Sequence, residues 1–161
     1  MQSITPFLWF DSQAEEAAEF YVSIFPNSRV RSVSRYGEGA PQPAGTAMSV
    51  SFTLDGLELQ GLNGGPRFPF TEAISFVVPA ATQDEIDRLW DALTSDGGEP
   101  SQCGWLKDKY GLSWQIVPPV LFELLADPDP ERSQRVMQAM LGMQKLDIAA
   151  LRAARNGAVP G

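Results

Sequence analysis

Histidine is absent from the sequence, and cysteine occurs only once among the 161 residues, as Cys103. Without histidine, the chain cannot build an imidazole metal site or pair a serine or cysteine nucleophile with a histidine base. One cysteine cannot form an internal disulfide, and it cannot by itself make a thiolate zinc site. The candidate proton carriers and nucleophiles that remain are carboxylates, lysine, tyrosine and the thiol of Cys103.

Basic side chains and long apolar runs are also scarce. Lysine and arginine number 12 against 20 aspartate and glutamate residues, which gives a net charge of −8. This charge argues against binding to nucleic acid or to an anionic membrane, because both favour a cationic surface. No apolar run approaches the ~20 residues that span a bilayer, and the first residues lack the pattern of a signal peptide. We therefore expect a cytoplasmic protein whose partners are neither nucleic acid nor membrane.

What the sequence does contain is an imperfect repeat of itself. Residues 6–25 and 73–93 follow one plan at a constant offset, which aligns Phe7 with Phe76 (76 − 7 = 69). A second match aligns DGLELQ, which ends at Gln60, with YGLSWQ, which ends at Gln115 (115 − 60 = 55). The repeat predicts two similar half-domains. With 43% hydrophobic residues, a chain of this length can share one core between them.

Apolar periodicity predicts the same order of elements, βαβββ, in both halves. In the first half we predict a helix capped by Asp11 or Ser12 and ending at residue 25, with strands over 4–10, 29–36, 48–54 and 57–62. In the second half we predict a helix over 83–95 and strands over 73–78, 103–107 and 112–117. The predicted fold class is α+β, with two tandem βαβββ modules forming a curved mixed sheet around a cleft.

The predicted modules make up one domain, which a helical segment follows. Residues 1–126 are assigned to this domain, with module one at about 1–65 and module two at about 70–120. After the segment DPDP, apolar residues at helical spacing predict a C-terminal helical extension over 127–161 that packs on the domain.

Alternation along the strands predicts which side chains face the helices. The last strand separates into a bulky set and a small or polar set, namely Leu112, Trp114 and Ile116 against Ser113, Gln115 and Val117. Bulky sets are expected to pack on the helices, and Trp9 and Trp114 are assigned to this core. Polar sets cannot be core without partners, so we expect them to line a hydrated cleft between the halves, which Trp105 reaches.

Three motifs carry a resemblance to a known family: LNGGP at 62–66, CGWLKDKYGLSWQIVP at 103–118 and KLDIAAL at 145–151. Together with the paired modules, they make the chain similar to the PhnB-like branch of the vicinal oxygen chelate superfamily. That superfamily includes glyoxalase I, extradiol dioxygenases, and fosfomycin and bleomycin resistance proteins. The resemblance implies their fold, and it also implies a homodimer.

The resemblance also implies where a metal would bind. Metal-using members place a ligand, usually histidine, at the start of each module and another, usually glutamate, on its last strand. These positions correspond here to Ile4, Ala73, Gln60 and Gln115. None is a histidine or a carboxylate, so we predict no metal site and no cofactor.

Neutral amides at two of these positions suit a different role, the recognition of a small polar or aromatic molecule. The residues assigned to ligand binding are Gln60, Gln115, Ser75, Ser113, Trp105, Cys103 and Asn63. Cys103 is also the one candidate for catalysis, with Lys107 as a conceivable activating cation. Two alternatives stay open: in one the two glutamines bond each other or water, and in the other Cys103 is an inert, half-buried thiol.

The sequence thus favours a metal-free protein that binds a small organic molecule in the cleft between the modules. One alternative is a glyoxalase-like enzyme with non-histidine chemistry at Cys103, Lys107 or a carboxylate such as Glu58. Another is a dimeric interaction module with a vestigial cleft. Members of this branch are sometimes labelled demethylubiquinone methyltransferases. However, the chain has no glycine-rich loop after a strand with a downstream acidic residue, as nucleotide-binding folds have.

Overall fold

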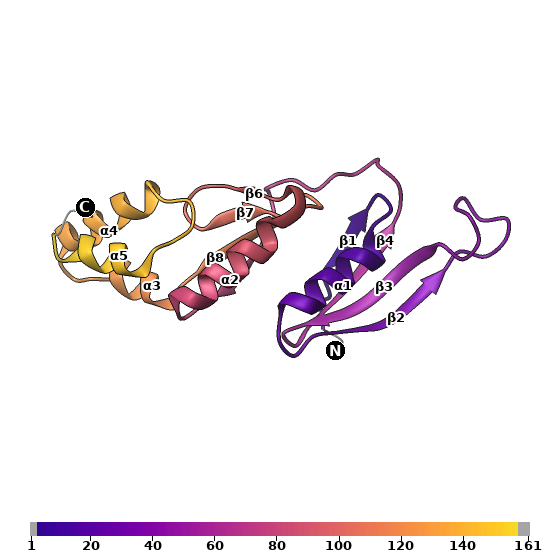
Figure 1. Ribbon diagram of the computed structural model, residues 1–161, viewed down its shortest axis with the longest axis horizontal. Helices are drawn as coiled ribbons and strands as arrows, with labels where there is room; N and C mark the ends of the chain where they lie inside the picture. The colour runs from indigo at the N-terminus through magenta and orange to yellow at the C-terminus, as the bar shows by residue number, and fades with distance from the viewer. Residues whose placement is uncertain (1–2, 158–161) are drawn as a thin grey trace. The chain divides into compact units, whose positions relative to one another are not determined.

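The computed structural model describes residues 3–157 and divides the chain between Phe70 and Thr71 into two compact units. Each unit contains one four-stranded mixed sheet, with a helix between its first and second strands. Figure 1 shows the first unit in indigo and magenta and the second from rose to yellow. The predicted α+β class, with two tandem βαβββ modules, is therefore confirmed.

The first unit holds five elements, β1 (Phe7–Phe10), α1 (Ala14–Ile24), β2 (Arg29–Arg35), β3 (Ala47–Leu54) and β4 (Leu57–Asn63). The strand order is β1-β4-β3-β2, with β1 parallel to β4 and the other pairs antiparallel. Its core lies between α1 and the sheet, where Tyr21 and Phe52 are fully buried and stack. Gly61 belongs to this layer, because a Cβ there would lie 3.2 Å from Val50 and 3.3 Å from Phe10.

The second unit repeats this plan with β5 (Ser75–Pro79), α2 (Gln83–Thr94), β6 (Glu99–Pro100), β7 (Trp105–Lys107) and β8 (Ser113–Val117), and it adds a 3₁₀ turn, η1 (Ser95–Gly97). The order is β5-β8-β7-β6, with β5 parallel to β8. Thr82 caps α2 by accepting a hydrogen bond from the Glu85 N–H at 3.2 Å. Trp114 and Ile116 are buried on the α2 side of the sheet, as predicted for Trp114.

The register of the strands corrects the predicted alignment of the two modules by one residue. Gln60 pairs with Phe7 and Gln115 pairs with Val77, so Phe7 corresponds to Val77 (77 − 7 = 70) and not to Phe76. The helices keep the predicted offset, since Tyr21 and Trp90 are both buried (90 − 21 = 69). The connection between the first strand and the helix is therefore one residue shorter in the second module.

This shift explains why the prediction for Trp9 was wrong. Leu8 and Phe10 are the buried residues of β1, whereas Trp9 is half-buried on the other face of the sheet. There the Trp9 indole N–H donates to the Gly65 carbonyl at 2.9 Å, and its ring meets Phe68 edge to face. The Trp9 side chain therefore packs against the loop that follows β4 and is not part of the core.

The start of α1 also differs from the prediction. Neither Asp11 nor Ser12 caps the helix; the N-cap position is Gln13, whose side chain makes no capping bond. The buried side chain of Asn63 fills this role from β4, where its Oδ1 accepts from the Ala14 N–H at 2.8 Å. Its Nδ2 donates to the Ala47 carbonyl at 3.0 Å, so one amide ties α1, β3 and β4 together.

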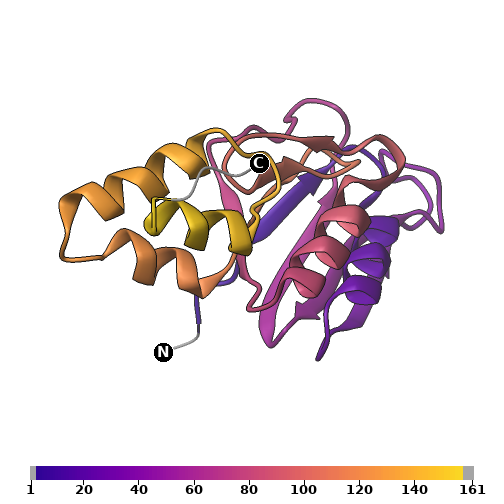
Figure 2. The ribbon, with the colours of Figure 1, turned by 60° about the vertical axis from the view of Figure 1, so that its left-hand side comes forward.

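Three helices follow β8 in the second unit, α3 (Pro119–Leu125), α4 (Pro130–Leu141) and α5 (Ile148–Arg155). Figure 2 shows them grouped beyond one end of β8. They enclose a small apolar core made of Val117, Leu121, Leu124, Val136, Leu146 and Leu151. Residues 158–161, the end of the predicted extension, lie outside the described residues.

A turn at Cys103 and Gly104 connects these helices to the sheet. The N–H of Cys103 donates to the Met143 carbonyl and that of Gly104 to the Gln144 carbonyl, each at 2.8 Å. Strand β7 therefore begins at Trp105 and not, as predicted, at Cys103. Within residues 3–157, no helix is both long and apolar enough to cross a bilayer.

Candidate functional site

Each sheet has a face opposite its helix, called the open face here, where the two modules place equivalent side chains. In the first unit the cross-strand neighbours of Gln60 are Ser51 on β3 and Phe7 on β1. In the second unit those of Gln115 are Trp105 on β7 and Val77 on β5. Phe7 and Val77 are 56% and 54% exposed, so both rows present apolar surface beside a glutamine.

A second row crosses the open face of the second unit beside the Gln115 row. This Lys107 row runs through Glu99 on β6, Lys107 on β7, Ser113 on β8 and Ser75 on β5. The two rows are joined, because the Gln115 Nε2 donates to the Ser75 Oγ at 2.9 Å. The sequence predicted Ser75, Ser113, Trp105 and Gln115 to lie on one face, and their register brings them together.

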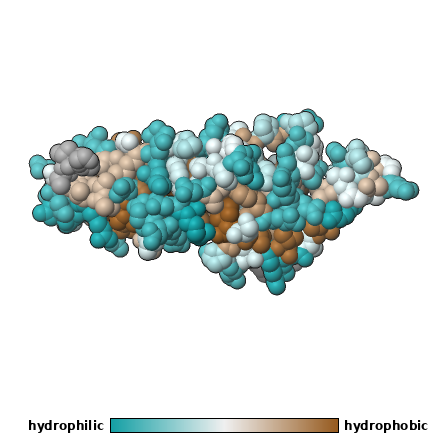
Figure 3. All heavy atoms as spheres, in the orientation of Figure 1, coloured by the Kyte–Doolittle hydropathy of each residue, from teal (hydrophilic) through white to brown (hydrophobic). Residues whose placement is uncertain are grey.

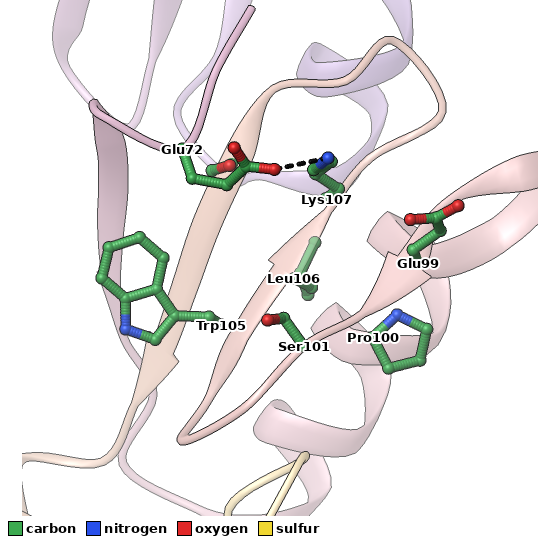
Figure 4. Close-up of a pocket in the computed structure, with 8 residues that line it drawn as sticks. Glu72, Glu99, Pro100, Ser101, Trp105, Leu106 and Lys107 are labelled. Atoms are coloured by element: carbon green, nitrogen blue, oxygen red, sulfur yellow. Dashed lines mark ion pairs between the residues drawn. The ribbon is translucent and has the colours of Figure 1, made fainter.

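A depression of about 200 Å³ lies on this face, lined by Glu72, Glu99, Pro100, Ser101, Trp105, Leu106, Lys107 and Ser113. Figure 4 shows the Lys107 amine pointing to the Glu72 carboxylate, with Trp105 at the start of β7 and Ser101 in the segment that follows β6. Glu72 and Glu99 were not among the predicted site residues. Glu72 lies in the turn before β5, and Glu99 lies in a strand of two residues, so alternation gave no signal for either.

The ion pair in the depression fixes the charge of both partners. The Lys107 Nζ lies 2.5 Å from the Glu72 Oε1. This hydrogen bond, helped by the attraction of opposite charges, lowers the pKa of Glu72 and raises the pKa of Lys107. Both groups are therefore ionised at neutral pH.

Ser113 is the unusual member of the Lys107 row. Its side chain is 1% exposed, and its Oγ has no hydrogen-bond partner among residues 3–157. A buried hydroxyl without a partner costs roughly 1–3 kcal/mol, so such a group in a depression is a reason to look for a ligand.

Removing the Ser113 hydroxyl is therefore expected to stabilise the free protein. We predict that Ser113→Ala raises the free energy of unfolding by up to ~1 kcal/mol, measured by urea denaturation. The matched variant Ser75→Ala loses the bond from Gln115 and is expected to lower it by ~0.5–1 kcal/mol. A loss of more than ~1 kcal/mol in Ser113→Ala would show that the hydroxyl has a partner within the fold.

The first unit has its own depression, of about 250 Å³, lined by Thr5, Arg31, Ser32, Ser51, Phe52, Glu58, Leu59 and Gln60. Glu58, a predicted alternative catalytic carboxylate, forms an ion pair with Arg31 there. Gln60 lies on this face and is exposed. The sequence did not single out Arg31, since an arginine on an edge strand is usually a solvated charge.

Two predicted ligand residues lie elsewhere. Asn63 is 3% exposed, and its amide is engaged with Ala14 and Ala47, which argues against a ligand contact through this side chain. Cys103 is half-buried in the turn before β7, with a φ of 58°, so it does not share the strand parity of Trp105. The predicted activating cation, Lys107, is paired with Glu72.

The donors at the positions that correspond to the expected metal ligands do not fit a divalent transition metal. The corrected offset makes Thr5 the equivalent of Ser75 (75 − 5 = 70); Thr5 lines the same depression as Gln60, and Ser75 is hydrogen-bonded to Gln115. Hydroxyl and amide oxygens supply no anionic or imidazole ligand for such an ion. No group of three or more histidine, cysteine, aspartate or glutamate side chains within residues 3–157 could hold a metal.

Comparison with known proteins gives a family and a fold. A family model described as 3-demethylubiquinone-9 3-methyltransferase matches residues 2–117. A PhnB protein from Bacillus cereus, described as a putative enzyme of that name, is 40% identical over 73% of this chain and 99% of its own, with a TM-score of 0.67. No curated protein matches the chain.

Fosfomycin resistance proteins share the fold at low identity. FosX from Mesorhizobium loti is 11% identical, covers 78% of this chain and 97% of its own, and has a TM-score of 0.53. FosX from Listeria monocytogenes, solved with Mn(II) and sulfate, is 15% identical over 73% of this chain and 89% of its own, with a TM-score of 0.50.

Proposed function

We propose a function on one premise: the chain belongs to the 3-demethylubiquinone-9 3-methyltransferase family, the PhnB-like branch of the vicinal oxygen chelate superfamily. On that premise the chain is a protein that binds a small organic molecule without a metal ion. Its contacts are the open-face residues Gln60, Gln115, Ser75, Ser113 and Trp105. The predicted cleft between the modules stays a prediction.

The observation that carries the proposal is the bond between Gln115 and Ser75 beside Trp105. The Gln115 amide is held by the Ser75 hydroxyl, so its orientation is fixed before a ligand arrives. Trp105 is its direct cross-strand neighbour and is half-buried. An oriented amide beside an aromatic ring suits a small molecule that has both a planar and a polar part.

A metal-free site follows from the donor set. Mn(II) accompanies the FosX protein of Listeria monocytogenes, whereas the described residues 3–157 of this chain contain no group of three or more histidine, cysteine, aspartate or glutamate side chains that could hold a metal. We also do not extend the methyltransferase description to this chain's activity. Its sheets are four-stranded and mixed, unlike the doubly wound parallel sheet that binds nucleotide cofactors.

The ion pairs of Lys107 with Glu72 and of Glu58 with Arg31 argue against the enzymatic alternative. A general base needs a pKa near the working pH, whereas Glu72 raises the pKa of Lys107 and keeps it protonated. Glu58 forms an ion pair with Arg31. These groups are suited to orient or neutralise a ligand.

Two further features of the proposal come from the family and composition alone, a homodimer and a cytoplasmic location. Hydrophilic residues dominate the face in Figure 3, with apolar atoms visible over the C-terminal helices. Phe122 and Leu141 on these helices are 61% and 52% exposed. This surface is the first one to test for a contact between two copies.

Native mass spectrometry of gently purified protein, with elemental analysis of the same sample, tests the proposed function. We expect the mass of one small organic molecule on the chain and no stoichiometric metal. The variant Gln115→Leu should lose most of this mass, whereas Gln138→Leu, an exposed position on α4, should retain it. A wild-type chain that carries a stoichiometric metal, or no molecule at all, would contradict the proposal.

A further inference from the structure

The depression of the second unit has a charge pattern that the proposed function does not use. Glu99, Lys107 and Ser113 occupy successive strands of the Lys107 row, so a carboxylate, an ammonium group and a hydroxyl lie side by side. The backbones of neighbouring strands lie ~4.8 Å apart. The side chains of Glu99 and Lys107, which have opposite charges, therefore start from positions one strand spacing apart.

Lys107 and Ser113 together can receive a carboxylate. An ammonium group has three N–H donors, and the Lys107 amine is shown bonding to one carboxylate, that of Glu72. Ser113 is directly opposite Lys107 on the neighbouring strand β8. The residue is 1% exposed, and its Oγ has no hydrogen-bond partner among residues 3–157. A second carboxylate placed beside them would accept from the amine and satisfy the buried hydroxyl.

Glu99 can receive an ammonium group. It is exposed, and no hydrogen bond or ion pair from its side chain is found within the described part of the chain. It lies directly opposite Lys107, close enough for its charge to raise the pKa of Lys107. With Glu72 and Glu99 against one lysine, the depression has one negative charge in excess, which favours a cationic group at this end.

Trp105 supplies the apolar side of the depression. Its ring is half-buried and lies two residues before Lys107 on the same face of β7. At about 200 Å³, the depression is smaller than the ~300–1,000 Å³ typical of drug-sized ligands. It therefore suits a small molecule with a short apolar or aromatic body.

From these observations we propose that the molecule bound on this face is a small amino-acid-like zwitterion with an aromatic body. Its carboxylate contacts Lys107 and Ser113, its ammonium group contacts Glu99, and its ring lies on Trp105. This inference rests on the proposed function, since it names the chemical class of the molecule held at the same open face.

Three probes that share a phenylethyl group test the charge requirement: L-phenylalanine, phenethylamine and 3-phenylpropionate. The second lacks the carboxylate and the third lacks the ammonium group. Isothermal titration of the full chain at low salt is expected to show L-phenylalanine binding about threefold to fivefold more tightly than either of the others, because each lacks one of the two charged groups. Equal or tighter binding of either single-charge probe would overturn the inference.

Two variants test which side chain contacts which charged group of the ligand, because each is expected to weaken a different pair of probes. Glu99→Gln should weaken L-phenylalanine and phenethylamine by about threefold to fivefold and leave 3-phenylpropionate unchanged. Ser113→Ala should weaken L-phenylalanine and 3-phenylpropionate and leave phenethylamine unchanged. Glu123→Gln, an exposed glutamate on α3, is the matched control and should change none of them.

The inference and the proposed function fail in different ways. If none of the three probes binds while native mass spectrometry finds an organic molecule on the chain, the zwitterion is wrong and the binding function stands. If Glu99→Gln weakens all three probes equally, the assignment of the ammonium group to Glu99 is overturned.

Discussion

Replacing Asn63 by alanine is expected to lower the free energy of unfolding by about 2–4 kcal/mol. The variant removes the cap of α1 and leaves the Ala14 N–H and the Ala47 carbonyl without their amide partner. Both bonds are buried, so water cannot easily replace the lost group. Urea denaturation followed by circular dichroism measures the loss.

The same strand offers a control for this prediction. Gln60→Ala removes an exposed amide three residues earlier on β4 and should cost less than ~0.5 kcal/mol. Similar losses in the two variants would mean that the Asn63 side chain does not hold α1 against the sheet.

Alanine at Gly104 is expected to be about as damaging, with a loss of ~3 kcal/mol. Gly104 has a φ of 85°, which an L side chain adopts at a cost. A Cβ there would also lie 2.9 Å from the Ile116 carbonyl oxygen and 3.0 Å from the Leu146 Cδ1. Neither the backbone oxygen nor the buried leucine can move freely, so strain and overlap add.

Gly111 separates these two effects. Its φ of 88° is nearly the same, but nothing lies within 4 Å of a Cβ placed there. Gly111→Ala should therefore show the backbone cost alone, ~1 kcal/mol. The difference between the two variants in the free energy of unfolding, measured by heat or urea, gives the cost of the steric overlap with Leu146 and the Ile116 carbonyl. If both cost the same, Leu146 and the Ile116 carbonyl must lie further from Gly104 than described.

Much of the fold could be predicted because it depends on local patterns. The internal repeat and the apolar periodicity predicted both modules, both helices and the burial of Trp114. The face of Trp9 was wrong because one offset was applied to a whole module. A connection shorter by one residue changes the parity of the strand, and a one-residue shift moves every side chain to the other face.

Contacts between distant residues account for the other differences. Asp11 and Ser12 were reasonable caps by position, but the bond to Ala14 comes from Asn63, 49 residues further along the chain. The strand at Cys103 is shortened by bonds to Met143 and Gln144, which no local pattern reveals. For the candidate site, alternation on β8 grouped Ser113 with Gln115. Glu99 is located only by the pairing of β6 with β7, and Glu72 only by its ion pair with Lys107.

The outer strands β2 and β6 also restrict how copies of this chain can associate. An unpaired strand edge is a template on which another chain can add a strand. Strand β2 carries Arg29, Arg31 and Arg35 along its length, and β6 has two residues and ends in Pro100. Charged side chains along an outer strand discourage pairing with another chain, and proline in β6 cannot donate a backbone bond. Strands β2 and β6 are therefore poor templates for strand addition by another copy of the chain, whereas β1 and β5 are the other outer strands of the two sheets.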